Sequence, residues 1–424
     1  MFFSTGVQMS SIVGSFSQVV DFVDPSARNH HLRVAIIAAA LAKEYGLTHE
    51  DVAQISLAAC FHDIGIFSLH EKIASLEFYP HLADINRHAE VGYILLKDIP
   101  KFHYVARMIR YHHVRWESHP YTPSMEHEIP LGSYILHLAD RIEVSLRRLA
   151  FQFGINEEKE IVEAIEKEAG KTFMPELVEV FKSLSSRLGF WLDIEYGDLE
   201  SLVKEILPTT TLSLKEMLVF GDVFSRVIDY RSTFTAVHSV GVSSVGTKLA
   251  EFYEFSPLEL SLMKLSGFLH DIGKLAVPSE ILEKPGRLDP SEWAIMKSHA
   301  YYSFRILEKL KGLRIVNYWA SFHHERIDGS GYPFGLKEDS LILGSRILAV
   351  ADVYTAISED RPYRKGMDKK QSIEVLKEMS QAGMLDSSIV ERTISHIDEL
   401  NEIRREVQTQ AKEKYEETTH GFLR

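Results

Sequence analysis

Histidines and aspartates recur in this chain at spacings that could build a metal centre. In the second half they are His238, His270, Asp271, His299, His323, His324 and Asp352. Imidazole nitrogens suit first-row transition metals, whereas magnesium and calcium prefer all-oxygen ligands. Two ions about 3.5–4 Å apart can activate water and hold a phosphoryl oxygen, and an aspartate can bridge them. The residue types therefore predict metal-dependent hydrolysis of a phosphate ester.

The same set occurs a second time in the first half of the chain. Its members are His30, His62, Asp63, His88, His112, His113 and Asp140. His62 precedes His270 by 208 positions, and Asp140 precedes Asp352 by 212, so the offset hardly drifts. A repeat of this length indicates an internal duplication, which gives an N-terminal and a C-terminal copy of one domain. His31 could serve in place of His30, because neighbouring histidines are not distinguished by sequence alone.

The segments that must position these residues have the patterns of helices. Ser256 to Glu259 and Asp289 to Glu292 each combine an N-cap, a first-turn proline and a capping-box glutamate. Residues 161–168 and 341–358 carry apolar side chains three and four positions apart, and no series of alternating strands is present. We therefore predict an all-α protein of two tandem helical domains joined by a helical linker.

The first domain is expected to cover residues 1–195, and the linker helix with the second domain residues 196–424. Trp293, Phe304 and Trp319 are expected in the hydrophobic core. Residues 401–418 alternate charges at helical spacing, which is typical of a solvated or dimer-packing helix.

Composition excludes several classes of protein. The net charge of −13 over 424 residues disfavours a long nucleic-acid partner but permits a small anionic ligand held by local cations. No apolar stretch reaches the 18 or more residues of a membrane span, and no basic segment indicates a signal peptide. A single cysteine, Cys60, excludes an intramolecular disulfide and fits a reducing compartment. We expect a cytoplasmic protein.

Three motifs give the C-terminal copy a family resemblance. His323 to Pro333 reads HHERIDGSGYP and resembles the HHExxDGxGYP motif of HD-GYP phosphodiesterases, a branch of the HD hydrolase superfamily. His270 to Lys274 matches that family's HDIGK, and Arg361 to Arg364 its RPYR segment. The resemblance covers roughly residues 230–400. It implies hydrolysis of cyclic di-GMP or 3′,3′-cyclic GMP-AMP to linear 5′-phosphorylated dinucleotides, with a second cleavage to mononucleotides left open.

The resemblance also implies roles for individual residues. Asp271 would bridge two divalent ions, iron or manganese, and Lys274 would contact the scissile phosphate, so both are expected to be catalytic. Arg361 and Arg364 would hold phosphates. Gly331 would let the backbone of the loop approach the ligand, and Tyr332 and Pro333 would shape a wall of the pocket. Glu325 and Asp328 would either support the metal ligands or order the loop. The implied metal ligands are His238, His270, Asp271, His299, His323, His324 and Asp352.

Two departures from the family pattern concern the C-terminal copy. Members with three metals carry a glutamate four residues before the first histidine, where this chain has Phe234, so two metals are expected. The family's HPxxG at the third histidine is here His299 followed by Ala300, which changes the pocket rim and leaves the ligand in place.

The N-terminal copy keeps the metal-binding residues and loses the phosphate-binding ones. Ile66 takes the place of the lysine, and Leu149 occupies the position that corresponds to Arg361 in the C-terminal copy. Residues 114–121 lack the GYP motif. We expect a second metal site at His30, His62, Asp63, His88, His112, His113 and Asp140 in a regulatory or dimerising domain.

Two other functions remain open at this point. The chain could be a catalytically silent cyclic-dinucleotide receptor, or an HD phosphohydrolase of ordinary nucleotides, against which Lys274 and the GYP loop argue. The sequence does not decide the preferred dinucleotide, the metal, the number of cleavage steps, the signal sensed by the N-terminal copy, or whether the chain forms a homodimer.

Overall fold

The computed structural model describes residues 6–23, 28–68, 82–120, 122, 128–148, 157–230, 237–284, 286–360 and 365–420. Within these ranges, extended pairing is limited to an antiparallel pair and one isolated bridge between Ala169 and Phe173. The pair joins β1 (Val7–Gln8) to β2 (Thr211–Leu212). The predicted all-α fold is therefore confirmed.

The chain divides into two compact units, residues 12–210 and residues 211–424 together with 1–11. The predicted domain boundary at 195/196 falls at the end of α9 (Leu188–Tyr196). Both α9 and the following α10 (Leu199–Ile206) contact α2 (His30–Tyr45) inside the first unit. The linker prediction corresponds to α11 (Leu214–Tyr230), which belongs to the second unit.

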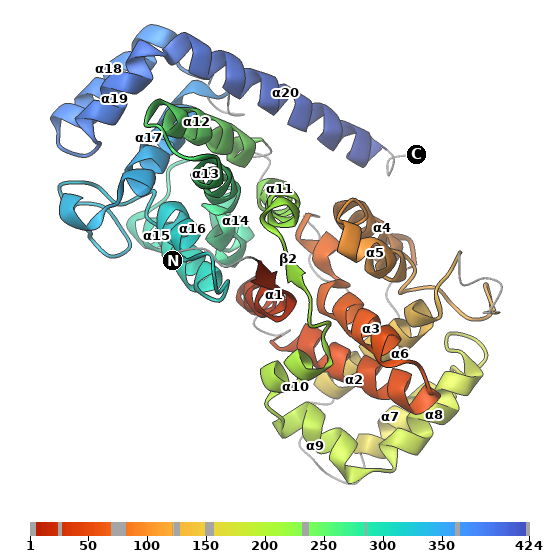
Figure 1. Cartoon of the computed structure of the whole chain (residues 1–424). Helices are drawn as coiled ribbons and strands as arrows, with labels where there is room; N and C mark the ends of the chain where they lie inside the picture. Colours follow the sequence, from red (N-terminus) through yellow and green to blue (C-terminus); the bar gives the residue numbers. More distant parts are fainter. Residues whose placement is uncertain are drawn as a thin grey trace. The chain divides into compact units, whose positions relative to one another are not determined.

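The first unit contains the N-terminal copy (Figure 1). Its elements are α1 (Met9–Val23) from residue 12 onward, α2, α3 (His49–Phe61), η2 (Ile64–Ser68), α4 (Leu82–Leu96), η4 (Pro100–Phe102), α5 (His103–Arg110), α6 (Leu131–Arg148), α7 (Glu157–Glu166), α8 (Pro175–Ser185), α9 and α10.

The second unit contains the C-terminal copy (Figure 1). Its elements after α11 are α12 (His238–Phe252), α13 (Pro257–Leu269), η6 (Ile272–Ala276), α14 (Ser279–Leu282), α15 (Pro290–Glu308), α16 (Arg314–Ser321), η7 (Glu338–Ser340), α17 (Leu343–Ser358), α18 (Lys369–Gln381), α19 (Ser387–Ser395) and α20 (Ile397–His420).

The helix starts follow the local signals in the sequence. Ser256 accepts a hydrogen bond from the backbone of Glu259, whose side chain accepts one in return, so α13 begins with a complete capping box. Asp289 and Glu292 form the same arrangement at the start of α15. A cap of this kind contributes about 1 kcal/mol. Each cap fixes the residue at which its helix begins, and so the position along the helix of every residue that follows.

Glycine allows a close helix contact at the same place in both copies. A Cβ on Gly273 would lie 1.9 Å from the backbone oxygen of His299, and one on Gly65 would lie 2.0 Å from that of His88. No side chain fits at such distances. The turn after each His-Asp pair therefore packs directly against the helix that carries the third histidine.

Two expectations about packing need correction. Trp293 was expected in the core but is 48% exposed, because the residues at the start of α15 lie at the surface, whereas Trp319 is buried as predicted. The charged helix α20 is not solvated on every face, since Arg404 and Gln408 are buried and the helix packs on α12 of its own unit. Among the described residues, no helix combines the length and apolar character needed to cross a lipid bilayer.

Candidate metal centres

The structure brings the seven predicted ligands of the C-terminal copy together from five helices and the turns that follow two of them. We call this set the C-terminal cage. His238 begins α12, His270 and Asp271 follow α13, His299 lies in α15, His323 and His324 follow α16, and Asp352 lies in α17. All except His324 are less than 9% exposed. A buried cluster of ionisable groups is stable only when the groups are paired or bind an ion.

Three of the histidines are oriented by their own helices. The Nδ1 atoms of His270, His299 and His323 each pair with the carbonyl oxygen three residues earlier, at 2.8, 2.7 and 2.6 Å respectively. Because the carbonyl is an acceptor, Nδ1 carries the proton and Nε2 keeps its lone pair. The backbone carbonyls therefore orient these three imidazoles so that the Nε2 atom of each is available to a metal ion.

The two aspartates lie at the centre of the cage. The Oδ2 atom of Asp271 lies 3.2 Å from His270 Nε2, and its Oδ1 atom lies 3.4 Å from His299 Nε2. The Oδ1 atom of Asp352 lies 3.1 Å from His238 Nε2, and its Oδ2 atom lies 3.7 Å from His324 Nδ1. The two oxygens of Asp271 thus face different histidines, which is the geometry that a bridging ligand requires.

The cage suits divalent metal ions because several of its donor atoms are buried and lack a hydrogen-bond partner. The Nε2 atoms of His270, His299 and His323 and the Oδ1 atom of Asp271 are buried without a hydrogen-bond partner. Such atoms are costly to bury unless a cation occupies the space between them. Ligand atoms of His238, His270 and Asp352 lie within 4.8 Å of one another, as do those of His299, His323 and His324. These are two sets of donors with Asp271 between them.

The electrostatics also favour a bound cation. Burial would raise the pKa of Asp271, but the neighbouring charges of His270 and Lys274 outweigh it and hold the pKa well below its usual range. Burial lowers the pKa of His323 to about 3, so its imidazole is neutral. Burial would also lower the pKa of His238, yet Glu359 and Asp352 outweigh it and raise it to about 10. A proton and a metal ion therefore compete for Nε2 of His238.

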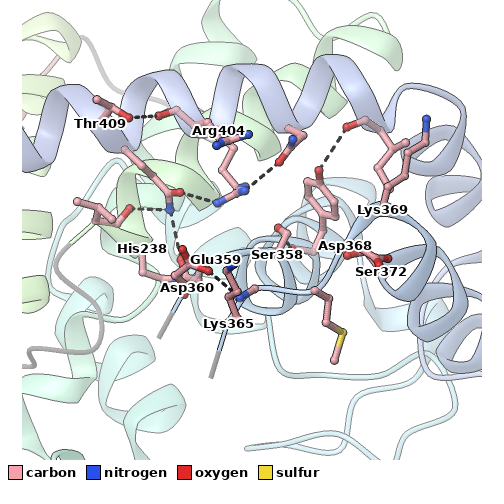
Figure 2. Close-up of a pocket in the computed structure, with 18 of the residues that line it drawn as sticks. His238, Ser358, Glu359, Asp360, Lys365, Asp368, Lys369, Ser372, Arg404 and Thr409 are labelled. Atoms are coloured by element: carbon pink, nitrogen blue, oxygen red, sulfur yellow. Dashed lines mark hydrogen bonds and ion pairs between the residues drawn. The ribbon is translucent and has the colours of Figure 1, made fainter. Parts of the chain in front are cut away.

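Glu359 orients His238 from outside the cage. Its carboxylate oxygens lie 3.0 and 3.2 Å from His238 Nδ1, so that nitrogen donates and Nε2 faces Asp352. Gln408 on α20 donates to Glu359 Oε2 at 3.2 Å, and Arg404 donates to Gln408 Oε1 at 2.7 Å. Figure 2 shows His238 and Glu359 together beneath α20. The C-terminal helix thus supports a carboxylate–histidine pair of the kind that raises ligand basicity.

A pocket of about 570 Å³ lies next to the cage, with His238 and Glu359 in its wall (Figure 2). It is lined by His238 and by residues from the end of α17, the segment after it, α18 and α20. Asp360 and Lys365, which flank the predicted phosphate-binding arginines, are among its walls. Arg361 and Arg364 themselves lie outside the described residues, as do Phe234 and Leu149.

The GYP loop packs beside the cage. The ring of Tyr332 lies 4.8 Å from that of His324, and the peptide bond to Pro333 is cis. A Cβ on Gly331 would lie 2.4 Å from the backbone nitrogen of Arg326, so the glycine serves the folding of the loop onto itself. Glu325 accepts hydrogen bonds from two backbone nitrogens of the loop, those of Phe334 and Leu336.

Two lysines lie at the edge of this site. Lys274, the residue predicted to contact the phosphate, donates from Nζ to Asp271 Oδ2 at 2.5 Å. In this structure it is therefore paired with the aspartate predicted to bridge the metal ions. Lys297 Nζ lies 5.8 Å from the ring centroid of Tyr332. Lys297 was not predicted as a site residue from the sequence. Its position two residues before His299 was the available signal.

The N-terminal copy repeats the arrangement with His30, His62, Asp63, His88, His112, His113 and Asp140, which we call the N-terminal cage. His62 and His112 donate from Nδ1 to the carbonyls of Ala59 and Ile109, at 2.8 and 2.6 Å. Ligand atoms of His30, His62 and Asp140 lie within 4.8 Å of one another, as do those of His88, His112 and His113. Both donor sets of the C-terminal cage therefore have counterparts.

The surroundings of the N-terminal cage differ. Arg141 donates to Asp140 Oδ2 at 2.6 Å, where the C-terminal cage has His324 facing Asp352 Oδ2. Glu143, which lies within α6, accepts a hydrogen bond from His30 Nδ1 at 2.5 Å. In the C-terminal copy the corresponding carboxylate, Glu359, comes just after α17. Neither Glu143 nor Glu359 was predicted from the sequence. They occupy different places relative to their aspartates, three and seven residues on, so the repeat gave no signal for either.

Comparison with known proteins matches both copies. A family model described as an HD domain matches residues 28–145, and a second with the same description matches residues 222–389. The 3′3′-cGAMP-specific phosphodiesterase 1 of Vibrio cholerae is 30% identical over 384 residues, which cover 88% of each chain. A cyclic di-GMP phosphodiesterase of Pseudomonas aeruginosa is 42% identical over 141 residues, covering 33% of this chain and 34% of that protein.

The fold is also found in a solved structure. The crystal structure of a cyclic GMP-AMP-specific phosphodiesterase of Vibrio cholerae aligns with a TM-score of 0.64 and 22% identity. The alignment covers 93% of this chain and 98% of that one. The similarity therefore concerns the fold of nearly the whole chain.

Proposed function

This chain belongs to the HD-GYP family of cyclic-dinucleotide phosphodiesterases, and we propose that its C-terminal copy carries out the hydrolysis. The observation that carries the proposal is the C-terminal cage, whose buried and unpartnered donor atoms lie beside the GYP loop. Seven ligands in two donor sets support two divalent ions, for which iron and manganese suit the nitrogen-rich shell. When bound, such a pair supplies an activated water and withdraws charge from a phosphoryl oxygen.

The residues of the chain have separate tasks in this reaction. Asp271 would bridge the ion pair through its two oxygens, while Glu359 and the helix carbonyls hold the imidazoles in the tautomer that binds metal. Lys274, whose Nζ lies 2.5 Å from Asp271 Oδ2, would contact an oxygen of the scissile phosphate. Its ammonium group would stabilise the negative charge that develops on that oxygen. Arg361 and Arg364 remain proposed phosphate ligands on the strength of the family motif.

The bond changes follow from the class of substrate. The oxygen of a water molecule joins one phosphorus of the cyclic dinucleotide, and the bond from that phosphorus to the 3′ oxygen breaks. A proton goes to the 3′ oxygen that leaves. The product is a linear dinucleotide with a 5′-phosphate, and a second cleavage of the same kind would give mononucleotides. Tyr332 and Pro333, beside His324, would form a wall of the substrate pocket.

We propose 3′,3′-cyclic GMP-AMP as the first substrate to test, with cyclic di-GMP as the second. The relative that covers 88% of this chain is named for the former, and the relative from Pseudomonas aeruginosa for the latter. The N-terminal copy is proposed to be regulatory, since Ile66 takes the place of the lysine. A cytoplasmic location and a homodimer stay predictions.

A substrate panel tests the proposal. Full-length protein reconstituted with Mn²⁺ is incubated with the two cyclic dinucleotides, with deoxynucleoside triphosphates and with guanosine tetraphosphate, and products are separated by chromatography. We expect ring-opened product from a cyclic dinucleotide and none from the other nucleotides. Tight binding of a cyclic dinucleotide without turnover would instead identify a silent receptor, and turnover of ordinary nucleotides would identify a different HD phosphohydrolase.

A further inference from the structure

His31 is a buried histidine that the reaction above does not use. It follows His30 in the first turn of α2 and is 3% exposed. Both of its ring nitrogens are buried without a hydrogen-bond partner. Leaving two polar atoms of one side chain in this state costs free energy, so a residue of this kind calls for a ligand.

The Nε2 atom of His31 is directed at the N-terminal cage. It lies 3.9 Å from Asp63 Oδ2, and the ring centroid lies 4.9 Å from that of His62. Ligand atoms of His31, His62 and Asp63 lie within 4.8 Å of one another. His31 therefore does not replace His30 in the cage, because both side chains reach it.

The neighbouring donors have the spacing of ligands around one ion. The Oδ2 atom of Asp63 lies 3.1 Å from His62 Nε2 and 3.6 Å from His30 Nε2. The Oδ1 atom of Asp140 lies 3.5 Å from His30 Nε2 and 3.8 Å from His62 Nε2. Two donors that are each about 2.0–2.2 Å from a metal lie roughly 3–4.4 Å apart. The separations in the N-terminal cage fall within that range.

The C-terminal copy has no such ligand at this position. Ser239 corresponds to His31 by the 208-residue offset. Its hydroxyl donates to Asp229 Oδ1 at 2.9 Å and its backbone nitrogen to Asp229 Oδ2 at 3.1 Å, so it is engaged away from the cage. The extra imidazole is thus specific to the N-terminal cage.

We infer that the N-terminal cage binds a divalent transition-metal ion through five side chains, with His31 as a ligand beside His30, His62, Asp63 and Asp140. Five protein donors leave at most one of six coordination positions for water. Metal sites that catalyse hydrolysis keep positions open, whereas sites filled by protein ligands serve structure. With the extra histidine as a ligand, the N-terminal ion is structural or regulatory. This agrees with the absence of the phosphate-binding residues from the N-terminal copy.

Metal binding by full-length variants tests this inference. Asp271→Ala removes the shared ligand of the C-terminal cage, and in that background the affinity for Mn²⁺ is measured after chelation and dialysis. We expect Mn²⁺ to remain bound, and Asp63→Ala added to this variant to abolish the binding. His31→Ser, which introduces the residue found at the corresponding position 239, is expected to weaken the Mn²⁺ affinity of the N-terminal cage by about tenfold or more. His103→Ser, which removes an exposed histidine of the same unit, should leave the affinity unchanged.

Two further measurements keep the result interpretable. His31→Gln retains a polar side chain of similar length, so it separates the loss of a ligand from the opening of a cavity. In crystals grown with Mn²⁺, anomalous scattering is expected to place an ion about 2.0–2.3 Å from His31 Nε2. Absence of Mn²⁺ from the Asp271→Ala protein would overturn the inference. Unchanged affinity in both His31 variants would overturn it as well. Neither outcome bears on the activity of the C-terminal copy.

Discussion

Replacing Glu359 by glutamine tests how the cage is supported. The carboxylate accepts from His238 Nδ1 at 3.0 and 3.2 Å and is 6% exposed, so it acts in a medium that screens it poorly. Glutamine keeps one acceptor oxygen and loses the charge. A hydrogen bond to a charged group contributes about 1.5–3 kcal/mol and a neutral one about 0.5–1.5 kcal/mol. The difference of about 1–1.5 kcal/mol corresponds to roughly a tenfold weaker metal affinity.

The assay is the initial rate of cyclic-dinucleotide hydrolysis by Glu359→Gln as a function of Mn²⁺ concentration. We expect the Mn²⁺ concentration for half-maximal rate to rise about tenfold, while kcat at saturating Mn²⁺ stays within about threefold of wild type. Glu374→Gln, at an exposed position of α18, is the matched control and should change neither value. An unchanged Mn²⁺ dependence would refute the supporting role. A kcat that stays a hundredfold low at saturating Mn²⁺ would show that Glu359 takes part in the chemistry itself.

Three other changes give separate tests. Lys274→Ala is expected to keep its Mn²⁺ while turnover falls by roughly 10²–10³, the scale of one lost charge-stabilising donor, as measured by elemental analysis and initial rates; equal losses of metal and activity would make this lysine structural. Gly273→Ala forces a Cβ against the backbone oxygen of His299, so we expect unfolding free energy to drop by about 1–3 kcal/mol or more in denaturant titrations, and wild-type stability would contradict the packing. Removing metal from wild-type protein with a chelator should lower the melting temperature reversibly, because ions bind the folded cages and not the unfolded chain; a melting temperature indifferent to added Mn²⁺ would contradict bound metal.

Much of the site could be predicted from the sequence because the chain contains it twice. The duplication identified each histidine and aspartate of the cages by its partner in the other copy, and helix signals such as the cap at Ser256 placed the elements between them. The structure then brought these side chains within a few ångströms of one another. Their roles as metal ligands stay predictions that the experiments above address.

What escaped prediction depends on tertiary packing. Glu359 supports His238 across 121 residues, and Gln408 reaches it from a helix that looked solvated by its charge pattern. No local motif encodes such contacts, and the two copies place the supporting carboxylate differently. His31 was recognised only as an alternative to His30. Its separate approach to Asp63 emerges from the first turn of α2, where consecutive side chains both face the cage.

The paired aspartates offer the most direct test of the central claim, that the C-terminal cage is the catalytic one. Asp271→Ala and Asp63→Ala remove the corresponding residue from each copy of the full-length chain, and hydrolysis of 3′,3′-cyclic GMP-AMP and cyclic di-GMP is measured with saturating Mn²⁺. We expect Asp271→Ala to abolish product formation and Asp63→Ala to retain it. Product formation at the wild-type rate by Asp271→Ala would contradict the account.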